Sequence, residues 1–229
     1  DENGQKYINF GSDKEAARNY FLQEVNQKSQ FFYSLAEKLE FLFDNDYYEP
    51  NVWEQYGLKR DSFGKIIKDE GFERVKGVYN LVYDVKHRFR TYMGALKFYS
   101  AYAMKSFDGS VWMERYEDRV VANALLLGLG DLEVARGIAM EIVQGRFQPA
   151  TPTFSNAGKS QRGELVSCFL VRIEDNFESI SKAVATSLQL SKRGGGVALN
   201  LTNIRETGAP IKKIEGMSSG VVPVMKILE

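Results

Sequence analysis

The sequence is poor in the side chains that bind metals and form disulfides, with one cysteine, Cys168, and one histidine, His87. A lone cysteine excludes an internal disulfide and is typical of a cytoplasmic protein. A histidine-based metal site within the chain is not expected, because His87 has no second histidine and stands between Lys86 and Arg88. Cys168 is therefore the one side chain with obvious redox chemistry.

The chain also lacks an excess of charge of either sign, since its 30 basic and 30 acidic residues cancel. No net field attracts nucleic acid or an anionic membrane, so neither is an expected partner. No apolar run reaches the roughly 18 residues of a membrane span, and no signal peptide pattern opens the sequence. What it does have is 44% hydrophobic residues over 229 positions, enough for a core in one or two domains.

The first 148 residues predict packed helices without chemistry of their own. Apolar residues recur there at helical spacing, and cap residues precede several of the runs. The stretch Leu81-Val-Tyr83 fits a helix and a strand equally well. We expect helices over residues 12–27, where Ser12 begins a capping box, over 32–42, shortly after Asp61, over 93–105, over 114–127 and from Asp131 to about 144.

From Pro149 onward the composition changes, and turn residues become frequent between short apolar runs. Residues 166–173 and 197–201 suit buried strands, and a capping box at Asp175-Asn-Phe-Glu178 opens a helix between them. A strand, a crossover helix and a second strand predict a parallel pair. We therefore expect an α/β protein with a helical region over residues 1–148 and a strand–helix–strand region over 149–229.

Two polar features of the second region have both a structural and a functional interpretation. Cys168 fits a small hydrophobe in a buried strand, and equally a redox thiol, which needs a second thiol that this chain lacks. Thr151-Pro-Thr153 fits a helix-to-strand turn, and equally a polar rim that holds a ligand hydroxyl.

Two further features leave the same choice open. Gly194-Gly195-Gly196 suits a helix end, or a close approach of the backbone to a ligand. It is neither a Walker loop nor a dinucleotide fingerprint, since no Gly-Lys-Ser/Thr follows and the order is helix, glycines, strand. Arg205 and Lys212, with Asp175, suit the phosphates and sugar of a nucleotide, or a solvated charged loop.

Taken in order, these stretches resemble the large (alpha) subunit of class I ribonucleotide reductase, and class Ib most of all. The resemblance is dense from about residue 93 onward. Its stretches are Phe98 to Lys105, Arg115-Tyr-Glu-Asp-Arg119, Gln148-Pro-Ala-Thr-Pro-Thr-Phe154, Arg162-Gly-Glu-Leu-Val-Ser-Cys168-Phe-Leu170, Leu190-Ser-Lys-Arg-Gly-Gly-Gly-Val197, Ile204-Arg-Glu-Thr-Gly-Ala-Pro-Ile-Lys212 and Ser219-Gly-Val-Val-Pro-Val-Met-Lys226.

The resemblance implies an enzyme that reduces ribonucleoside diphosphates to 2′-deoxyribonucleoside diphosphates by thiyl-radical chemistry. Cys168 matches one half of the redox-active cysteine pair. The family's contacts to the substrate ribose match Thr151, Ser167, Cys168 and Gly196. Contacts to a dNTP or ATP effector, which sets the choice of substrate, match Asp175 and Arg205, with Lys212 as a further basic contact. The implied fold is a helical region followed by the first part of a ten-stranded α/β barrel.

The resemblance also implies partners. A metal-containing beta subunit supplies the radical, a thioredoxin- or glutaredoxin-type donor supplies electrons, and the alpha subunit forms a homodimer with no cofactor bound directly. The second redox cysteine is not among these 229 residues, so we expect the remainder of the alpha subunit, in the same or another chain, to complete the site. Two alternatives are a non-catalytic nucleotide-binding or dimerisation module and an unrelated helical adaptor.

Overall fold

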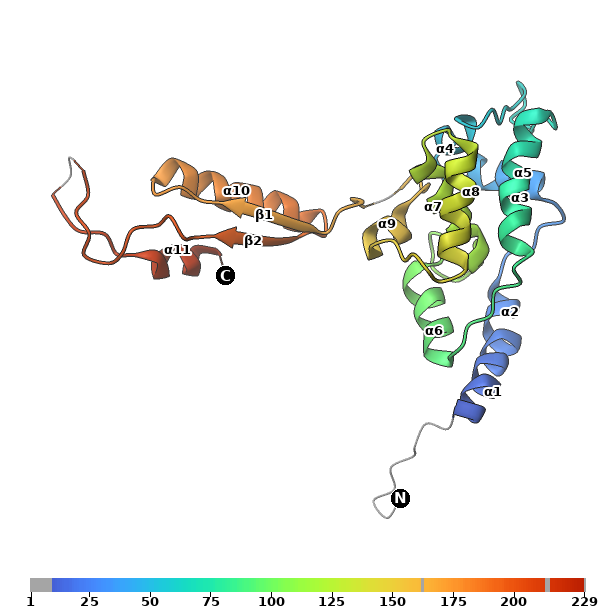
Figure 1. Ribbon diagram of the computed structural model, residues 1–229, viewed down its shortest axis with the longest axis horizontal. Helices are drawn as coiled ribbons and strands as arrows, with labels where there is room; N and C mark the ends of the chain where they lie inside the picture. Colours follow the sequence, from blue (N-terminus) through green and yellow to red (C-terminus); the bar gives the residue numbers. More distant parts are fainter. Residues whose placement is uncertain (1–9, 162, 213–214, 229) are drawn as a thin grey trace, which may run out of the picture. The chain divides into compact units, whose positions relative to one another are not determined.

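The computed structural model describes residues 10–161, 163–212 and 215–228, and the chain divides into two compact units, Asp1–Arg162 and Gly163–Glu229 (Figure 1). The described part of the first unit is helical, whereas the second contains a short parallel sheet. The expected α/β fold is confirmed. Residues 149–161 belong by their contacts to the first unit, although their composition placed them with the second. The functional domain boundary near residue 148 stays a prediction.

The regular elements of the described part of the first unit are helices, joined by turns and a few isolated β-bridges. They are α1 (Phe10–Tyr20), the π-helical η1 (Phe21–Val25), α2 (Asn26–Lys28), α3 (Leu35–Asp44), α4 (Asn51–Glu54), α5 (Glu70–Tyr83), α6 (Tyr92–Lys97), the π-helical η2 (Phe98–Tyr102), α7 (Tyr116–Gly128), α8 (Leu132–Val143) and α9 (Thr151–Asn156). The sequence indicated most of these helices, but not the short α4 and α9 and not the 14-residue α5, where only Leu81-Val-Tyr83 was considered and left open between helix and strand.

Local hydrogen bonds explain where the helices begin. Side-chain oxygens of Ser34, Asp69 and Asp131 accept bonds from the first amides of α3, α5 and α8, as expected of N-cap residues. The chain is already helical at Phe10, so Ser12 lies inside α1 and does not begin it. Leu81-Val-Tyr83 is helical and ends α5.

The helix expected after Asp61 is wrong. The Asp61 carboxylate instead accepts bonds from the amides of Phe63 and Lys65, at 2.8 and 2.9 Å. An antiparallel bridge between Arg60 and Ile66 closes the turn. A side chain that satisfies these amides offers the backbone an alternative to the helical bonds.

Helix α7 lies at the centre of the core. Five consecutive or near-consecutive apolar residues of α7 are fully buried, namely Val120, Val121, Ala122, Ala124 and Leu125. Helices α5, α8 and α9 contact α7, and α8 lies beside it in Figure 1. A helix buried on every side holds its neighbours in fixed positions, and one of these is α9, which begins at Thr151.

The second unit consists of two parallel strands and two helices. Strands β1 (Cys168–Arg172) and β2 (Gly196–Asn200) pair in parallel, as predicted, and α10 (Phe177–Lys192) connects them. Helix α10 packs on the sheet, and α11 (Val221–Leu228), which the sequence did not indicate, packs on α10. Exposed residues alternate with half-buried ones along both strands. One face of the sheet is therefore open within this unit.

Candidate functional site

The open face of the sheet carries the predicted redox cysteine. Cys168 and Gly196 are partners in the strand register, and each is the first residue of its strand. The Gly196 amide donates a 2.6 Å hydrogen bond to the Ser167 carbonyl, and Ser167 Oγ lies 3.8 Å from Cys168 Sγ. Three of the four predicted ribose contacts therefore lie together. Cys168 is exposed, so within this unit the interpretation as a buried hydrophobe is wrong.

The glycine triplet ends α10 and leads into β2. Gly194 has a φ of 86°, the left-handed conformation typical of a residue after a helix. Gly195 is needed for space, because a Cβ there would lie 2.3 Å from Cε2 of Phe169. The three amides donate to the carbonyls of Ser191, Leu190 and Ser167, in that order. None of these amides is free to form an anion nest.

The predicted effector residues are only partly brought together. Arg205 Nε donates a 2.5 Å hydrogen bond to Asp175 Oδ2, and its Nη1 donates to the Pro210 carbonyl at 2.9 Å. Both side chains of the ion pair are about one-third exposed. Lys212 is exposed, and no ion pair of Lys212 is found among the described residues. Of the three predicted effector residues, Arg205 and Asp175 are therefore in contact, and their opposite charges neutralise each other.

The capping box predicted around Asp175 is displaced by one residue. Asn176, not Asp175, caps α10, because its side chain accepts a 2.8 Å bond from the Ser179 amide. This leaves the Asp175 carboxylate free to bind Arg205, 30 residues further along the chain. The sequence does not distinguish the two because Asp and Asn are equally good N-caps.

Thr151 lies in the first unit, apart from the other predicted ribose contacts, and each unit is described by itself. It is the exposed first residue of α9, and its Oγ1 lies 3.4 Å from the hydroxyl of Tyr102 in η2. The rings of Tyr102 and Phe154 meet edge to face at 5.6 Å. Tyr102 therefore contacts a candidate site residue through its hydroxyl.

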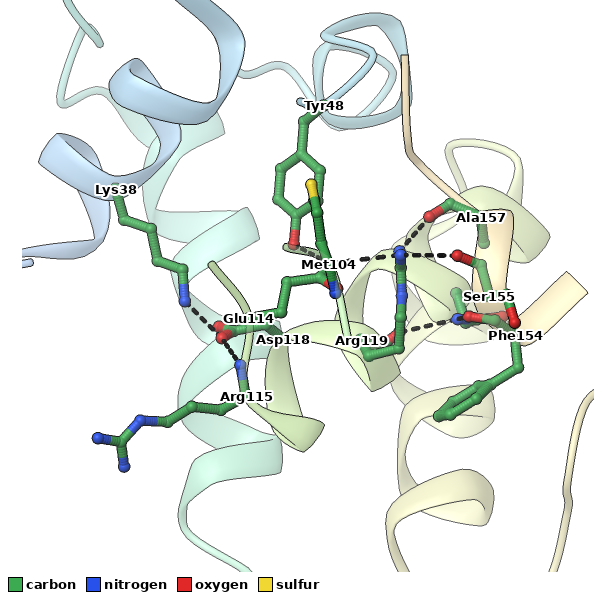
Figure 2. A network of polar contacts seen from close by, with 11 residues as sticks. Lys38, Tyr48, Met104, Glu114, Arg115, Asp118, Arg119, Phe154, Ser155 and Ala157 are labelled. Atoms are coloured by element: carbon green, nitrogen blue, oxygen red, sulfur yellow. Dashed lines mark hydrogen bonds and ion pairs between the residues drawn. The ribbon is translucent and has the colours of Figure 1, made fainter. Parts of the chain in front are cut away.

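A buried polar network lies between α7 and the end of α9, and the sequence did not indicate it (Figure 2). Its members Glu114, Asp118, Arg119 and Asn123 are at most 2% exposed. The stretch Arg115-Tyr-Glu-Asp-Arg119 was noted only as part of the resemblance. The sequence did contain a signal for this network. Asp118 and Arg119 directly precede the buried apolar residues of α7, and charged residues are rarely buried unless they are paired.

One end of this network fixes the beginning of α7. Asp118 accepts bonds from the Arg115 amide at 2.7 Å, from the Tyr83 hydroxyl at 2.9 Å and from Lys38 Nζ. At the other end, the Tyr48 hydroxyl donates to Glu114 at 2.6 Å. Burial and the nearby Glu114 carboxylate raise the pKa of Tyr48 well above its usual value. Tyr48 therefore stays protonated and donates to Glu114 throughout the ordinary pH range.

The described residues contain no cluster of three histidine, cysteine, aspartate or glutamate side chains that could hold a metal ion. Across the same described ranges, no helix combines the length and the apolar character needed to cross a bilayer.

Sequence comparisons match the chain to one family along nearly its whole length. Three domain families match in order: "Ribonucleotide reductase N-terminal" over residues 1–72, "Ribonucleotide reductase, all-alpha domain" over 88–162, and "Ribonucleotide reductase, barrel domain" over 166–229. The second match ends at the residue where the first compact unit ends.

Three relatives show the same similarity. The "Ribonucleoside-diphosphate reductase subunit alpha" of Mycoplasma pneumoniae is 50% identical over 97% of this chain and 29% of its own length. The protein of that name from Mycoplasma genitalium is 49% identical over the same shares. The "NrdEB subunit alpha" of Bacillus subtilis is 45% identical over 96% of this chain and 19% of its own length. The chain thus spans less than a third of these relatives.

Proposed function

Since the chain belongs to the ribonucleotide reductase alpha-subunit family, we propose that it supplies one redox cysteine and part of the ribose and effector contacts of a ribonucleoside-diphosphate reductase. The observation that carries this proposal is the pairing of Cys168 and Gly196 on the open face of the sheet, with the Ser167 hydroxyl 3.8 Å from the sulfur. An exposed thiol beside a hydroxyl and a residue without a side chain leaves room for a sugar.

The proposed chemistry is a two-electron reduction at the 2′ carbon of the ribose. The C2′–O bond breaks and the oxygen leaves as water, while a hydrogen is added to the same carbon. The Cys168 thiol and a second thiol, from outside these 229 residues, supply the two electrons and two protons and join as a disulfide. Thiyl-radical chemistry, started by a radical from a beta subunit, activates the ribose for this step. A thioredoxin- or glutaredoxin-type dithiol then reduces the disulfide.

Position favours Cys168 in this role. At the first residue of β1 it lies at the end of the strand, and its neighbour on the same face is Gly196, whose missing side chain leaves the sulfur open to a ligand. Ser167 brings a hydroxyl within 3.8 Å of the sulfur. Thr151 is the fourth proposed ribose contact, and it belongs to the other unit.

We assign the ion pair of Asp175 and Arg205 to the effector site. A carboxylate suits the hydroxyls of a ribose, and a guanidinium suits phosphate. An effector that binds here replaces the 2.5 Å contact between Arg205 and Asp175 by its own contacts with the two side chains. Until an effector binds, the ion pair holds the guanidinium and the carboxylate in place. Lys212 is the proposed further phosphate contact, on the same loop.

A non-catalytic nucleotide-binding or dimerisation module is the second candidate, and the one-third exposed ion pair of Asp175 and Arg205 in the second unit supports it equally. The two candidates differ in one requirement. The reductase needs a second cysteine from the remainder of the alpha subunit, whereas the module needs none. Binding of deoxynucleotides by an assembly that contains no cysteine besides Cys168 favours the module.

The decisive experiment replaces Cys168 by serine in the complete alpha subunit that contains this sequence, assayed with its beta subunit. We expect Cys168→Ser to abolish repeated turnover with a thioredoxin-type donor and to leave effector binding, measured by calorimetry, unchanged. Ala198→Ser is the matched control, because it adds a hydroxyl to the same face of the sheet and leaves the thiol in place. Full turnover by Cys168→Ser contradicts the assignment.

A further inference from the structure

Helix α9 depends on side chains of α7 for its position. It has six residues, too few for a helix to be stable by itself in water. The last carbonyls of any helix lack partners within the helix and need donors from elsewhere. In α9 those donors are the side chains of Arg119, shown in Figure 2, and of Asn123, and both are fully buried in α7.

Three carbonyls at the end of α9 are bound in this way. Arg119 Nη1 donates to the Ser155 carbonyl at 3.3 Å, and its Nη2 donates to the Ala157 carbonyl. Asn123 Nδ2 donates to the Phe154 carbonyl at 3.1 Å and to the Arg119 carbonyl at 2.8 Å. The end of α9 is therefore attached to one helix through two side chains.

Glu114 holds the guanidinium at this position. Its Oε1 lies 3.4 Å from Arg119 Nη1, and both side chains are fully buried. The same carboxylate accepts the Tyr48 hydroxyl at 2.6 Å and the Met104 amide at 2.8 Å. A buried charge is costly unless it is paired and hydrogen-bonded, so Arg119 and Glu114 each require the other.

We propose that Arg119, oriented by Glu114, is a positioning residue for Thr151 at the other end of α9. The inference rests on the ribose contact proposed above for Thr151. The guanidinium fixes the last carbonyls of the helix, and the helix is short enough that its first residue moves with its last. The 3.4 Å contact with the Tyr102 hydroxyl then sets the direction of the Thr151 side chain.

An arginine is required at this place and a lysine does not replace it. The planar guanidinium presents donors in a fixed fork, so it binds two carbonyls and a carboxylate at once, whereas an ammonium is a single point charge. Arg119→Lys therefore keeps the buried charge next to Glu114 but removes the donors to the Ser155 and Ala157 carbonyls, so that only Asn123 still binds the end of α9. A small displacement of a substrate contact is expensive, because catalysis depends on alignment to a fraction of an ångström.

The test measures kinetics and local stability in the complete alpha subunit. In Arg119→Lys we expect KM for the nucleoside diphosphate to rise about tenfold and amide hydrogen exchange over residues 151–157 to become faster. Effector affinity stays unchanged. A role in stability alone lowers Tm and the active fraction but leaves KM of the folded enzyme unchanged, and that result overturns the proposal.

Two variants complete the design. Arg146→Lys is the matched control, because Arg146 also pairs with a carboxylate, Glu141, at 2.8 Å but is exposed; KM stays the same. Asn123→Ala removes only the bond to Phe154 and a bond within α7, and we expect it to raise KM less than Arg119→Lys does. If Arg119→Lys does not fold, Asn123→Ala decides: an unchanged KM there overturns the proposal.

A double-mutant cycle separates this inference from the proposed function. If Arg119 acts through Thr151, Arg119→Lys combined with Thr151→Val raises KM no further than Thr151→Val alone. A raised KM in Thr151→Val beside additive effects in the double variant overturns the positioning role only. An unchanged KM in Thr151→Val removes the ribose contact itself, and the positioning role with it.

Discussion

Cys168 and Gly196 lie opposite each other at the first position of two parallel strands, and the Gly196 amide donates to the carbonyl of the residue before Cys168 at 2.6 Å. The strand register, rather than any loop, therefore fixes the place of the sulfur. A site built on paired strands is held more rigidly than one on a loop. This suits a thiol that has to meet both a sugar and a second thiol.

The first prediction separates two neighbouring glycines. A Cβ at position 195 would lie 2.3 Å from the Phe169 ring, whereas one at position 196 would meet only the Ser167 carbonyl at 3.4 Å. We expect Gly195→Ala to lower the free energy of unfolding by about 1–3 kcal/mol, as overpacking does, and Gly196→Ala to change it little. Urea unfolding followed by circular dichroism measures both.

The two glycine variants also test the proposed ribose contact. In the complete alpha subunit, Gly196→Ala places a methyl group on the face that carries Cys168, so we expect substrate affinity to fall although the fold is kept. Equal losses of stability in the two variants contradict the assignment of Gly195 to packing. An unchanged substrate affinity in Gly196→Ala contradicts the ribose contact.

The second prediction concerns Arg205. A one-third exposed ion pair contributes little to stability, so we expect Arg205→Ala to lower the free energy of unfolding by no more than about 1 kcal/mol. Loss of the guanidinium removes the proposed phosphate contact, and we expect effector affinity, measured by calorimetry, to fall at least about tenfold, since a charge-assisted bond is worth 1.5–3 kcal/mol.

Arg193→Ala is the control for this prediction. Arg193 also forms an exposed ion pair in the second unit, with Glu164 at 3.1 Å, but it is not assigned to the effector. A similar loss of affinity in both variants shows a general effect of charge and contradicts the specific contact. Retained affinity in Arg205→Ala contradicts it as well.

Much of the fold was predictable from the sequence because periodicity and caps act locally. The parallel strands, helix α10 and the Asp131 cap follow from such signals. The turn after Asp61 was missed because a single carboxylate satisfies two amides that a helix would have used. Helix α9 was missed because six residues are too few for a period to appear, and because its stability comes from Arg119, more than 30 residues earlier.

The candidate site was predictable in part, for a similar reason. Ser167, Cys168 and Gly196 come together through strand pairing, which the sequence indicates. The contact of Arg205 with Asp175 joins two loops 30 residues apart, and no local pattern reports it. The buried network of Glu114 and Arg119 was not predicted, because burial of a charged residue depends on partners that are distant in sequence.

The third prediction concerns Lys159, which follows α9 and is half-buried near the same network. Burial lowers the pKa of its ammonium group from 10.5 to about 8; the Glu114 carboxylate opposes this shift, and the Arg119 guanidinium adds to it. Between about pH 8 and 10.5 the unfolded chain therefore binds more protons at this residue than the folded one. Its contribution to stability rises with pH over that window and is least favourable at pH 7.

We therefore expect Lys159→Met to raise the free energy of unfolding at pH 7 by about 1–3 kcal/mol, since each unit of pKa shift corresponds to about 1.4 kcal/mol. The gain should shrink at pH 9.5, where the folded wild-type protein has already released this proton. Urea unfolding at both pH values measures the difference. Lys159→Arg is the control, because a guanidinium stays charged at both pH values: relative to the wild-type protein it should gain nothing at pH 7 and be less stable at pH 9.5. A gain of equal size at pH 7 and pH 9.5 contradicts the prediction, because it would mean that the benefit comes from packing of the methionine and not from removal of a buried charge.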